Sequence, residues 1–220
     1  MIRNYIRKTI YLIVLIGYSF SHAGSYDDFF SAVRRDNARD VKALLDRGFD
    51  PNTINLDGHF ALMLALKDLS WNVVKALVAH PSTDVDIRNA NDETPIMLAA
   101  LKGRLDVVQA LIDRDASLNK PGWTALHYAA SQSDPKVIQL LLDHFAYIDA
   151  ESPNGTTPLM MAAMYANEDA VKILIDAGAD VSLRNARGLS ALDFATRAQK
   201  QASIYLLAEA LRDSKPAAGW

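Results

Sequence analysis

A short segment that recurs five times along the chain constrains the fold more than any other sequence feature. Each copy is six residues long, is mostly apolar and ends in alanine. The copies are Phe60–Ala65, Thr94–Ala99, Thr124–Ala129, Thr157–Ala162 and Ser190–Ala195. Their third residues lie at positions 62, 96, 126, 159 and 192, so the spacings are 34, 30, 33 and 33 residues. A second apolar run follows each copy. A period of this length predicts repeats that bury their apolar faces against one another.

The motif residues predict that each repeat contains two short helices. Thr94, Thr124 and Thr157 stand where a side-chain oxygen can cap a helix start, and Pro95 and Pro158 occupy the first helical position, where the missing N–H costs nothing. The apolar residues follow at helical spacing.

The second helix of each repeat has signals of its own. Asp134 and Pro135 start one of these helices, and Gly48 and Gly178 follow two others, where a left-handed cap suits glycine.

The repeated unit resembles the ankyrin repeat, a 33-residue unit that carries Thr-Pro-Leu-His-x-Ala. The resemblance covers Tyr26 to about Leu211 and includes an amino-terminal unit, Asp28–Asn52, that lacks the entry motif. It implies an all-α solenoid of paired antiparallel helices joined by β-hairpin-type loops. We expect a signal peptide over 1–23, a repeat domain over 24–211 and a short tail over 212–220. The expected units are 26–52, 53–89, 90–120, 121–150, 151–185 and 186–211.

The amino terminus has the three-part pattern of a secretory signal. Arg3, Arg7 and Lys8 precede an apolar run over 10–20, and Ser21-His22-Ala23 supplies small residues for cleavage after Ala23. The alternative is an uncleaved anchor, but eleven apolar residues fall short of the ~20 that span a bilayer. We expect export, to the periplasm in a Gram-negative bacterium, without stable membrane insertion after cleavage.

Composition excludes several classes of function. The net charge of −3 disfavours a nucleic-acid binder, and the absence of cysteine excludes disulfides and thiolate metal sites. The chain has no phosphate-binding glycine loop, no His-Glu-x-x-His helix and no Gly-x-Ser-x-Gly elbow. We therefore expect no enzyme and no cofactor. A metal-binding or hydrolytic protein on the same frame remains the least favoured alternative.

Three departures from the repeat pattern stand out. Met63, Met97 and Met160 replace the histidine of the motif, which only His127 keeps. Phe145 occupies a cap position where glycine is usual, and the turn at 119–122 is about three residues shorter than its siblings. Broken local rules often mark sites of function.

Two possible sites are better explained by structure. Met160, Met161 and Met164 could hold copper(I), but the first two fall on packing positions, so core filling is favoured. Asn154-Gly155-Thr156 matches an N-glycosylation acceptor and equally an ordinary turn.

The resemblance implies that the chain binds another protein through its loop tips and the exposed ends of its first helices. The corresponding residues are Leu56, His59, Lys67, Asp68, Asn91, Glu93, Leu101, Lys102, Lys120, Trp123, Ser131, Gln132, Asn154, Thr156, Met164, Tyr165, Arg187 and Leu189. Trp123 is expected to contact the partner, with local packing as the alternative, and Trp71 to be buried between repeats. We expect a monomer that assists or stabilises a periplasmic enzyme, for example one that handles oxidative stress. The alternative is an inhibitor or immunity protein that neutralises a toxin.

Overall fold

The computed structural model describes residues 24–132 and 134–214, and the regular elements in these ranges are helices. The chain divides into two compact units, Met1–Asp84 and Val85–Trp220. The predicted signal peptide and most of the predicted tail lie outside the described residues. The six unit boundaries predicted from the sequence stay a prediction.

The first unit places aromatic residues at the start of the repeat domain. A helix over residues 24–34 is followed by α2 (Ala38–Asp46), α3 (Ala61–Lys67) and α4 (Trp71–Ala79), and α4 contacts both α2 and α3. The ring of Phe29 lies 5.3 Å from that of Phe30 and 4.4 Å from that of Phe49, between centroids. Trp71 is half-buried rather than buried, so its predicted burial is only partly met.

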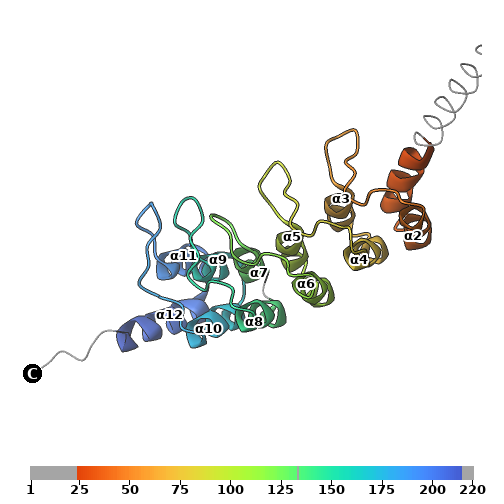
Figure 1. Ribbon diagram of the computed structural model, residues 1–220. Helices are drawn as coiled ribbons and strands as arrows, with labels where there is room; N and C mark the ends of the chain where they lie inside the picture. The colour runs from red at the N-terminus through yellow and green to blue at the C-terminus, as the bar shows by residue number, and fades with distance from the viewer. Residues whose placement is uncertain (1–23, 133, 215–220) are drawn as a thin grey trace, which may run out of the picture. The chain divides into compact units, whose positions relative to one another are not determined.

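The second unit is a stack of helix pairs (Figure 1). Its helices are α5 (Pro95–Leu101), α6 (Leu105–Ile112), α7 (Ala125–Ala130), α8 (Pro135–Asp143), α9 (Pro158–Tyr165), α10 (Glu168–Asp176), α11 (Ala191–Arg197) and α12 (Gln201–Asp213). One layer holds the first helices, in which α7 contacts α5 and α9, and α9 contacts α11. The other holds the second helices, in which α8 contacts α6 and α10, and α10 contacts α12. The expected all-helical repeat fold is confirmed.

The core of both units comes from the recurring motif. Leu62, Ile96, Leu126 and Leu159, the third residues of four copies, are each at most 1% exposed. The alanines of the same helices let neighbouring backbones approach closely. Within the described residues no helix is both long and apolar enough to cross a membrane.

The predicted helix caps form with full hydrogen-bond geometry at some starts and not at others. The carboxylate of Asp134 accepts the N–H of Lys136, and the Thr157 hydroxyl accepts that of Met160. Thr94 is arranged as a capping box with Met97, although its buried hydroxyl makes no hydrogen bond of full geometry among the described residues. Thr124 forms a capping box with His127, and its hydroxyl also lies 2.9 Å from Nδ1 of that ring.

Four of the second helices, α2, α6, α8 and α10, end in one common turn that requires a left-handed residue. Gly48, Asp115, Phe145 and Gly178 occupy this position, with φ of 87°, 59°, 64° and 94°. At Phe145 the N–H of the next residue, Ala146, donates to the carbonyl of Leu141, which closes the turn. Phe145 therefore adopts the left-handed conformation of this cap position, which costs about 1–2 kcal/mol relative to glycine.

Candidate functional site

The exposed ends of the first helices form one part of the candidate surface. In the second unit Lys102, Gln132 and Tyr165 are exposed at the ends of α5, α7 and α9, and the side chain of Tyr165 is 60% exposed. Their predicted partners Leu101, Ser131 and Met164 are half-buried. In the first unit Lys67 and Asp68 are both exposed at the end of α3. The structure thus gives these positions solvent access with one aromatic ring among polar groups.

The loop tips form the other part, and their side chains hold the tip shape. The side-chain oxygens of Asn55, Asn89 and Asn185 each accept two backbone N–H groups from the residues two and four positions on. Ser152 serves the fourth tip by accepting the N–H of Thr156. These bonds lie within each tip and fix the shape of its backbone, and one further bond, from the N–H of Ala186 to the carbonyl of Asn154, joins two neighbouring tips.

Several tip residues expected at the surface are exposed and others are not. Leu56, at 94%, is exposed together with Asn91, Asn154 and Arg187, whereas His59 and Leu189 are half-buried. Thr156 is 5% exposed, so its prediction as a contact residue is wrong. Its carbonyl faces inward, where it lies 2.9 Å from Nε2 of His127.

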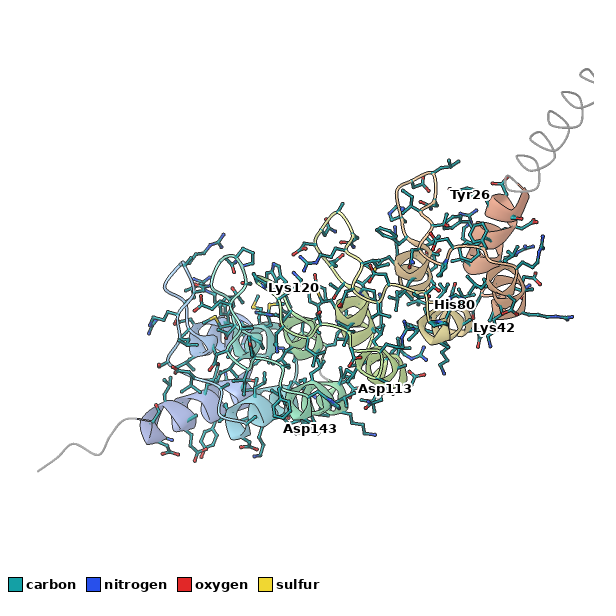
Figure 2. The ribbon with its side chains drawn as sticks, in the orientation of Figure 1. Tyr26, Lys42, His80, Asp113, Lys120 and Asp143 are labelled. Atoms are coloured by element: carbon teal, nitrogen blue, oxygen red, sulfur yellow. The ribbon has the colours of Figure 1, made fainter. Side chains whose placement is uncertain are left out.

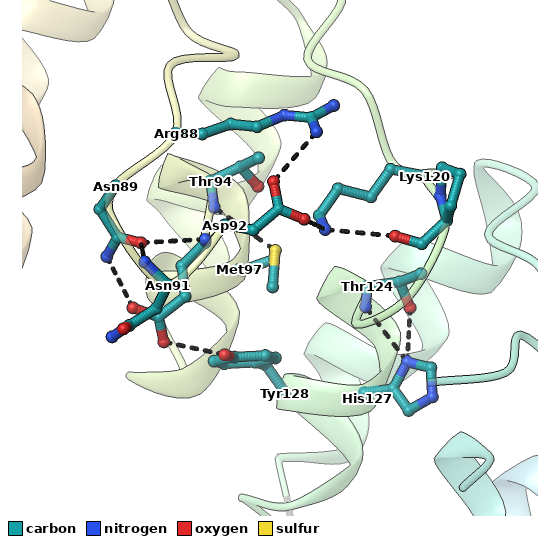
Figure 3. A network of polar contacts seen from close by, with 12 residues as sticks. Arg88, Asn89, Asn91, Asp92, Thr94, Met97, Lys120, Thr124, His127 and Tyr128 are labelled. Atoms are coloured by element: carbon teal, nitrogen blue, oxygen red, sulfur yellow. Dashed lines mark hydrogen bonds and ion pairs between the residues drawn. The ribbon is translucent and has the colours of Figure 1, made fainter. Parts of the chain in front are cut away.

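The shortened turn at 119–122 produces the largest departure from expectation. Asn119 bonds to the following repeat, where its amide donates to the carbonyl of Phe145 and its oxygen accepts the N–H of Tyr147. Lys120 then extends to the preceding tip and places Nζ 2.5 Å from the Asp92 carboxylate (Figure 3). Its side chain is only 6% exposed, so the prediction of Lys120 as a surface contact is wrong.

A second link joins the same two repeats. The Tyr128 hydroxyl donates to the Glu93 carboxylate at 2.8 Å, and burial followed by this hydrogen bond raises the pKa of Tyr128 (Figure 3). Asp92 accepts from Lys120 and from Arg88, and these bonds hold the pKa of its carboxyl below its usual value. Glu93 and Lys120 therefore join repeats, and the free surface of this tip is limited to residues such as Asn91.

Trp123 packs locally. It is half-buried, and its ring meets that of His127 edge-on with centroids 5.1 Å apart. The local-packing alternative describes this ring better than the expected outward contact does.

The side chain at the fourth position of the motif accepts the same backbone hydrogen bond in four repeats, although the residue there is Met, His or Asp. The backbone N–H of the first motif residue is accepted by Sδ of Met97, by Nδ1 of His127, by Sδ of Met160 and by the carboxylate of Asp193. The methionines thus replace the acceptor of the missing histidine. Only the histidine also reaches the next repeat, through Nε2.

The described residues give little support for chemistry at a metal or an acid–base pair. Residues 24–132 and 134–214 contain no group of three or more His, Asp or Glu side chains able to hold a metal ion. Met160 is 1% exposed and bonded through its sulfur, which leaves it poorly placed as a copper ligand. Burial lowers the pKa of His127 to about 4, so this ring is neutral at pH 7.

Comparison with known proteins identifies the repeats. A family model described as "Ankyrin repeats (3 copies)" matches residues 29–121, 72–152, 115–185 and 145–215. Rat ankyrin repeat and SAM domain-containing protein 6 is 34% identical over 97 residues, which are 42% of this chain and 11% of that protein. Human transient receptor potential cation channel subfamily A member 1 is 28% identical over 114 residues, 50% of this chain and 10% of that protein.

A third relative extends the same result. Human neurogenic locus notch homolog protein 2 is 34% identical over 123 residues, 54% of this chain and 5% of that protein. The chain therefore spans between 5% and 11% of the length of these three relatives.

Proposed function

This chain belongs to the ankyrin repeat family, and from that premise we propose that it is an exported module that binds a partner protein through the ends of its first helices. Ankyrin repeats generally bind proteins. The identity of the partner and the exported location are our own inferences.

Tyr165 is the observation that carries the binding proposal. Its ring is 60% exposed at the end of α9, and half-buried Met164 lies beside it in the sequence. Aromatic rings and methionine are both enriched in the cores of protein interfaces, where they bury a large apolar area. Lys102 and Arg197 stand exposed at the ends of α5 and α11, on either side of this centre in repeat order. These cations favour a partner whose matching surface is acidic.

The amino-terminal sequence supports export. Three basic residues, eleven apolar residues and the small residues before Gly24 follow the order that a signal peptidase reads. The net charge of the remaining chain is −6, since cleavage removes three basic and no acidic residues.

Between the two roles considered, the surface favours a helper that docks on or stabilises an exported enzyme, such as one that handles oxidative stress. A tight toxin inhibitor needs several anchors that become fully buried at the centre of the interface. The row of first-helix ends offers one exposed ring among polar side chains, which suits a broader and weaker contact.

Paired baits test the binding proposal. The exported protein, its Tyr165→Ala variant and the control variant Tyr205→Ala would each be used to capture proteins from the compartment to which the chain is exported. Tyr205 is 63% exposed on α12, so the control removes an equally exposed ring elsewhere. A protein retained by wild type and by Tyr205→Ala but lost by Tyr165→Ala supports the proposal. Equal retention by all three contradicts it.

The amino terminus of the exported protein tests the location separately. We expect the chain to begin at Gly24, which Edman sequencing or intact mass would report. A chain that retains Met1 and sediments with membranes would overturn export by cleavage, while leaving the binding proposal intact.

A further inference from the structure

The loops that follow the second helices line up as a row in the second unit. With the last residue of α8 and of α10 included, they comprise residues 113–119, 143–151 and 176–182, at the ends of α6, α8 and α10. Asn119 of the first loop bonds to the backbone of Phe145 and Tyr147 in the second, at 2.9 and 2.8 Å. Asp149 of the second loop accepts the N–H of Asp180 in the third at 3.1 Å. These bonds hold the three loops side by side.

The middle loop carries two exposed aromatic rings. The side chain of Phe145 is 84% exposed and that of Tyr147 is 67% exposed. At the same two positions the preceding loop has Asp115 and Ser117, and the following loop has Gly178 and Asp180. Among the described residues no other ring stacks on either aromatic. The repeat fold does not use these rings, since the neighbouring repeats form the same turn without them.

Phe145 makes the fold less stable than glycine would. It adopts φ of 64°, which the C-terminal turn requires and which an L side chain disfavours. Because the ring is exposed, burial within the chain does not offset this cost.

Carboxylates are numerous in the three loops that include the aromatic pair. The three segments contain seven acidic residues and one arginine: Asp113, Asp115, Asp143, Asp149, Glu151, Asp176 and Asp180 against Arg114. Asp176 pairs with Lys172 at 2.5 Å, which leaves six carboxylates against one arginine. Figure 2 labels Asp113 and Asp143, which end or follow α6 and α8. Each accepts from a neutral glutamine amide, Gln109 or Gln139, at 2.8 Å, so its charge is not cancelled by that bond. Negative charge at the carboxyl end of a helix is also opposed by the helix dipole.

We propose that the exposed rings of Phe145 and Tyr147, with the carboxylates of these three loops, form a docking surface for a segment of a partner protein in which Lys or Arg alternates with apolar residues. The rings accept apolar side chains and the methylene stems of the cations, and their faces attract the charged heads. The carboxylates match the positive charge. This surface uses none of the first-helix residues, so it adds a second binding site to the proposed function.

A labelled peptide measures the docking directly. Fluorescein-labelled (Lys-Leu)4 would be titrated with the exported protein and followed by anisotropy, with (Glu-Leu)4 as the charge-reversed control. We expect the basic peptide to bind, with an affinity that falls as salt rises, and the acidic peptide to bind at least about tenfold more weakly. Equal affinity for the two peptides would overturn the proposed partner chemistry.

A matched pair of glycine variants separates docking from stability. Phe145→Gly and Leu69→Gly each remove an exposed apolar side chain from a left-handed position, since Leu69 has φ of 59° and is 49% exposed in the first unit. Both are expected to fold and to melt at higher temperature. Only Phe145→Gly should weaken peptide binding, by about tenfold. Unchanged binding in Phe145→Gly would overturn the proposal.

Two further measurements complete the test. Asp115→Asn keeps a side chain that tolerates the left-handed turn. This variant should weaken binding of the basic peptide and make its affinity less dependent on salt. An unchanged salt dependence would count against the carboxylates as ligands. Sedimentation of the exported protein without peptide should show a monomer. A dimer that Phe145→Gly abolishes would assign the aromatic pair to a second copy of the chain and overturn the basic-segment proposal.

Discussion

At the scale of single residues, His127 differs from its counterparts by joining two repeats. Met97 and Met160 accept one N–H through sulfur and have no second polar group. His127 accepts the N–H of Thr124 and places Nε2 2.9 Å from the carbonyl of Thr156, and it is fully buried. With Nδ1 accepting, Nε2 carries the proton that it donates to that carbonyl.

Replacing His127 with Met should therefore remove one bond while keeping the other. The sulfur of the new Met can still accept the N–H of Thr124, as the sulfur of Met97 accepts the N–H of Thr94. The carbonyl of Thr156, however, loses its donor. We expect the free energy of unfolding at pH 7.5 to fall by about 1–2 kcal/mol. Urea denaturation of wild type and variant measures this. A loss below the error of the method would mean that the inter-repeat bond contributes nothing.

The same variant should change the response to acid. Burial lowers the pKa of His127 to about 4 against 6.5 in the unfolded chain, so between these values the unfolded state binds more protons. This contribution to stability is complete above pH 6.5 and is lost as pH falls towards 4, by up to about 3 kcal/mol. His127→Met should therefore be less stable than wild type at pH 7.5 and no less stable at pH 4.5. Parallel pH–stability curves would contradict the assignment.

Phe145 presents the opposite case, a residue whose replacement should stabilise the fold. Glycine relieves the left-handed strain at the price of a more flexible unfolded chain, so the net gain for Phe145→Gly is about 1 kcal/mol. Thermal unfolding should show a rise of a few degrees. The reciprocal change Gly178→Phe, at φ of 94°, should lower the melting temperature. Destabilisation by Phe145→Gly would show that the ring packs against the protein after all.

At the scale of elements, the shortened turn at 119–122 is held to the tip of the preceding repeat by the ion pair between Lys120 and Asp92. Lys120 is nearly buried while Asp92 is half-exposed, so the two members of the pair are not equivalent. Removing Asp92 leaves a desolvated ammonium behind, whereas removing the Lys120 charge leaves a carboxylate that water and Arg88 still stabilise.

Asp92→Asn should thus lower the melting temperature more than Lys120→Met does. Asn tolerates the left-handed conformation of Asp92, with φ of 59°, and Met preserves the stem of Lys120, so neither variant adds backbone strain or a cavity. Differential scanning calorimetry in low salt compares them. The reverse order of melting temperatures would mean that the pair is not desolvated.

The helices and their caps could be predicted from the sequence where the interactions that form them lie within one repeat. The motif spacing, Asp134 and the glycines at 48 and 178 act within their own helix, so the helix pairs and several caps follow from the sequence. Lys120 was misplaced because its side chain, in the shortened turn, reaches the Asp92 carboxylate of the preceding repeat. Thr156 was misplaced because it is buried, with its carbonyl beside His127 of the preceding repeat, and Trp123 because its ring packs on His127. The acceptor role of Met97 and Met160 was also missed. The histidine pattern at that position could have indicated it.

At the scale of the whole molecule, the second unit presents two separate sets of exposed side chains. Tyr165, with Lys102 and Gln132, belongs to the ends of the first helices, whereas Phe145 and Tyr147 belong to the loops after the second helices. The first set includes a cation and suits an acidic surface. The second is acidic and suits a basic segment. One chain could in this way hold two partners of opposite charge.

The affinity of the captured partner for single variants tests the central claim most directly. Isothermal titration of the purified partner into wild type, Tyr165→Ala and Tyr205→Ala gives three dissociation constants. We predict that Tyr165→Ala weakens binding at least about tenfold, because an exposed tyrosine at the centre of an interface contributes 1–2 kcal/mol or more, and that Tyr205→Ala stays within about twofold. Three equal dissociation constants would show that the partner does not bind at the first-helix ends.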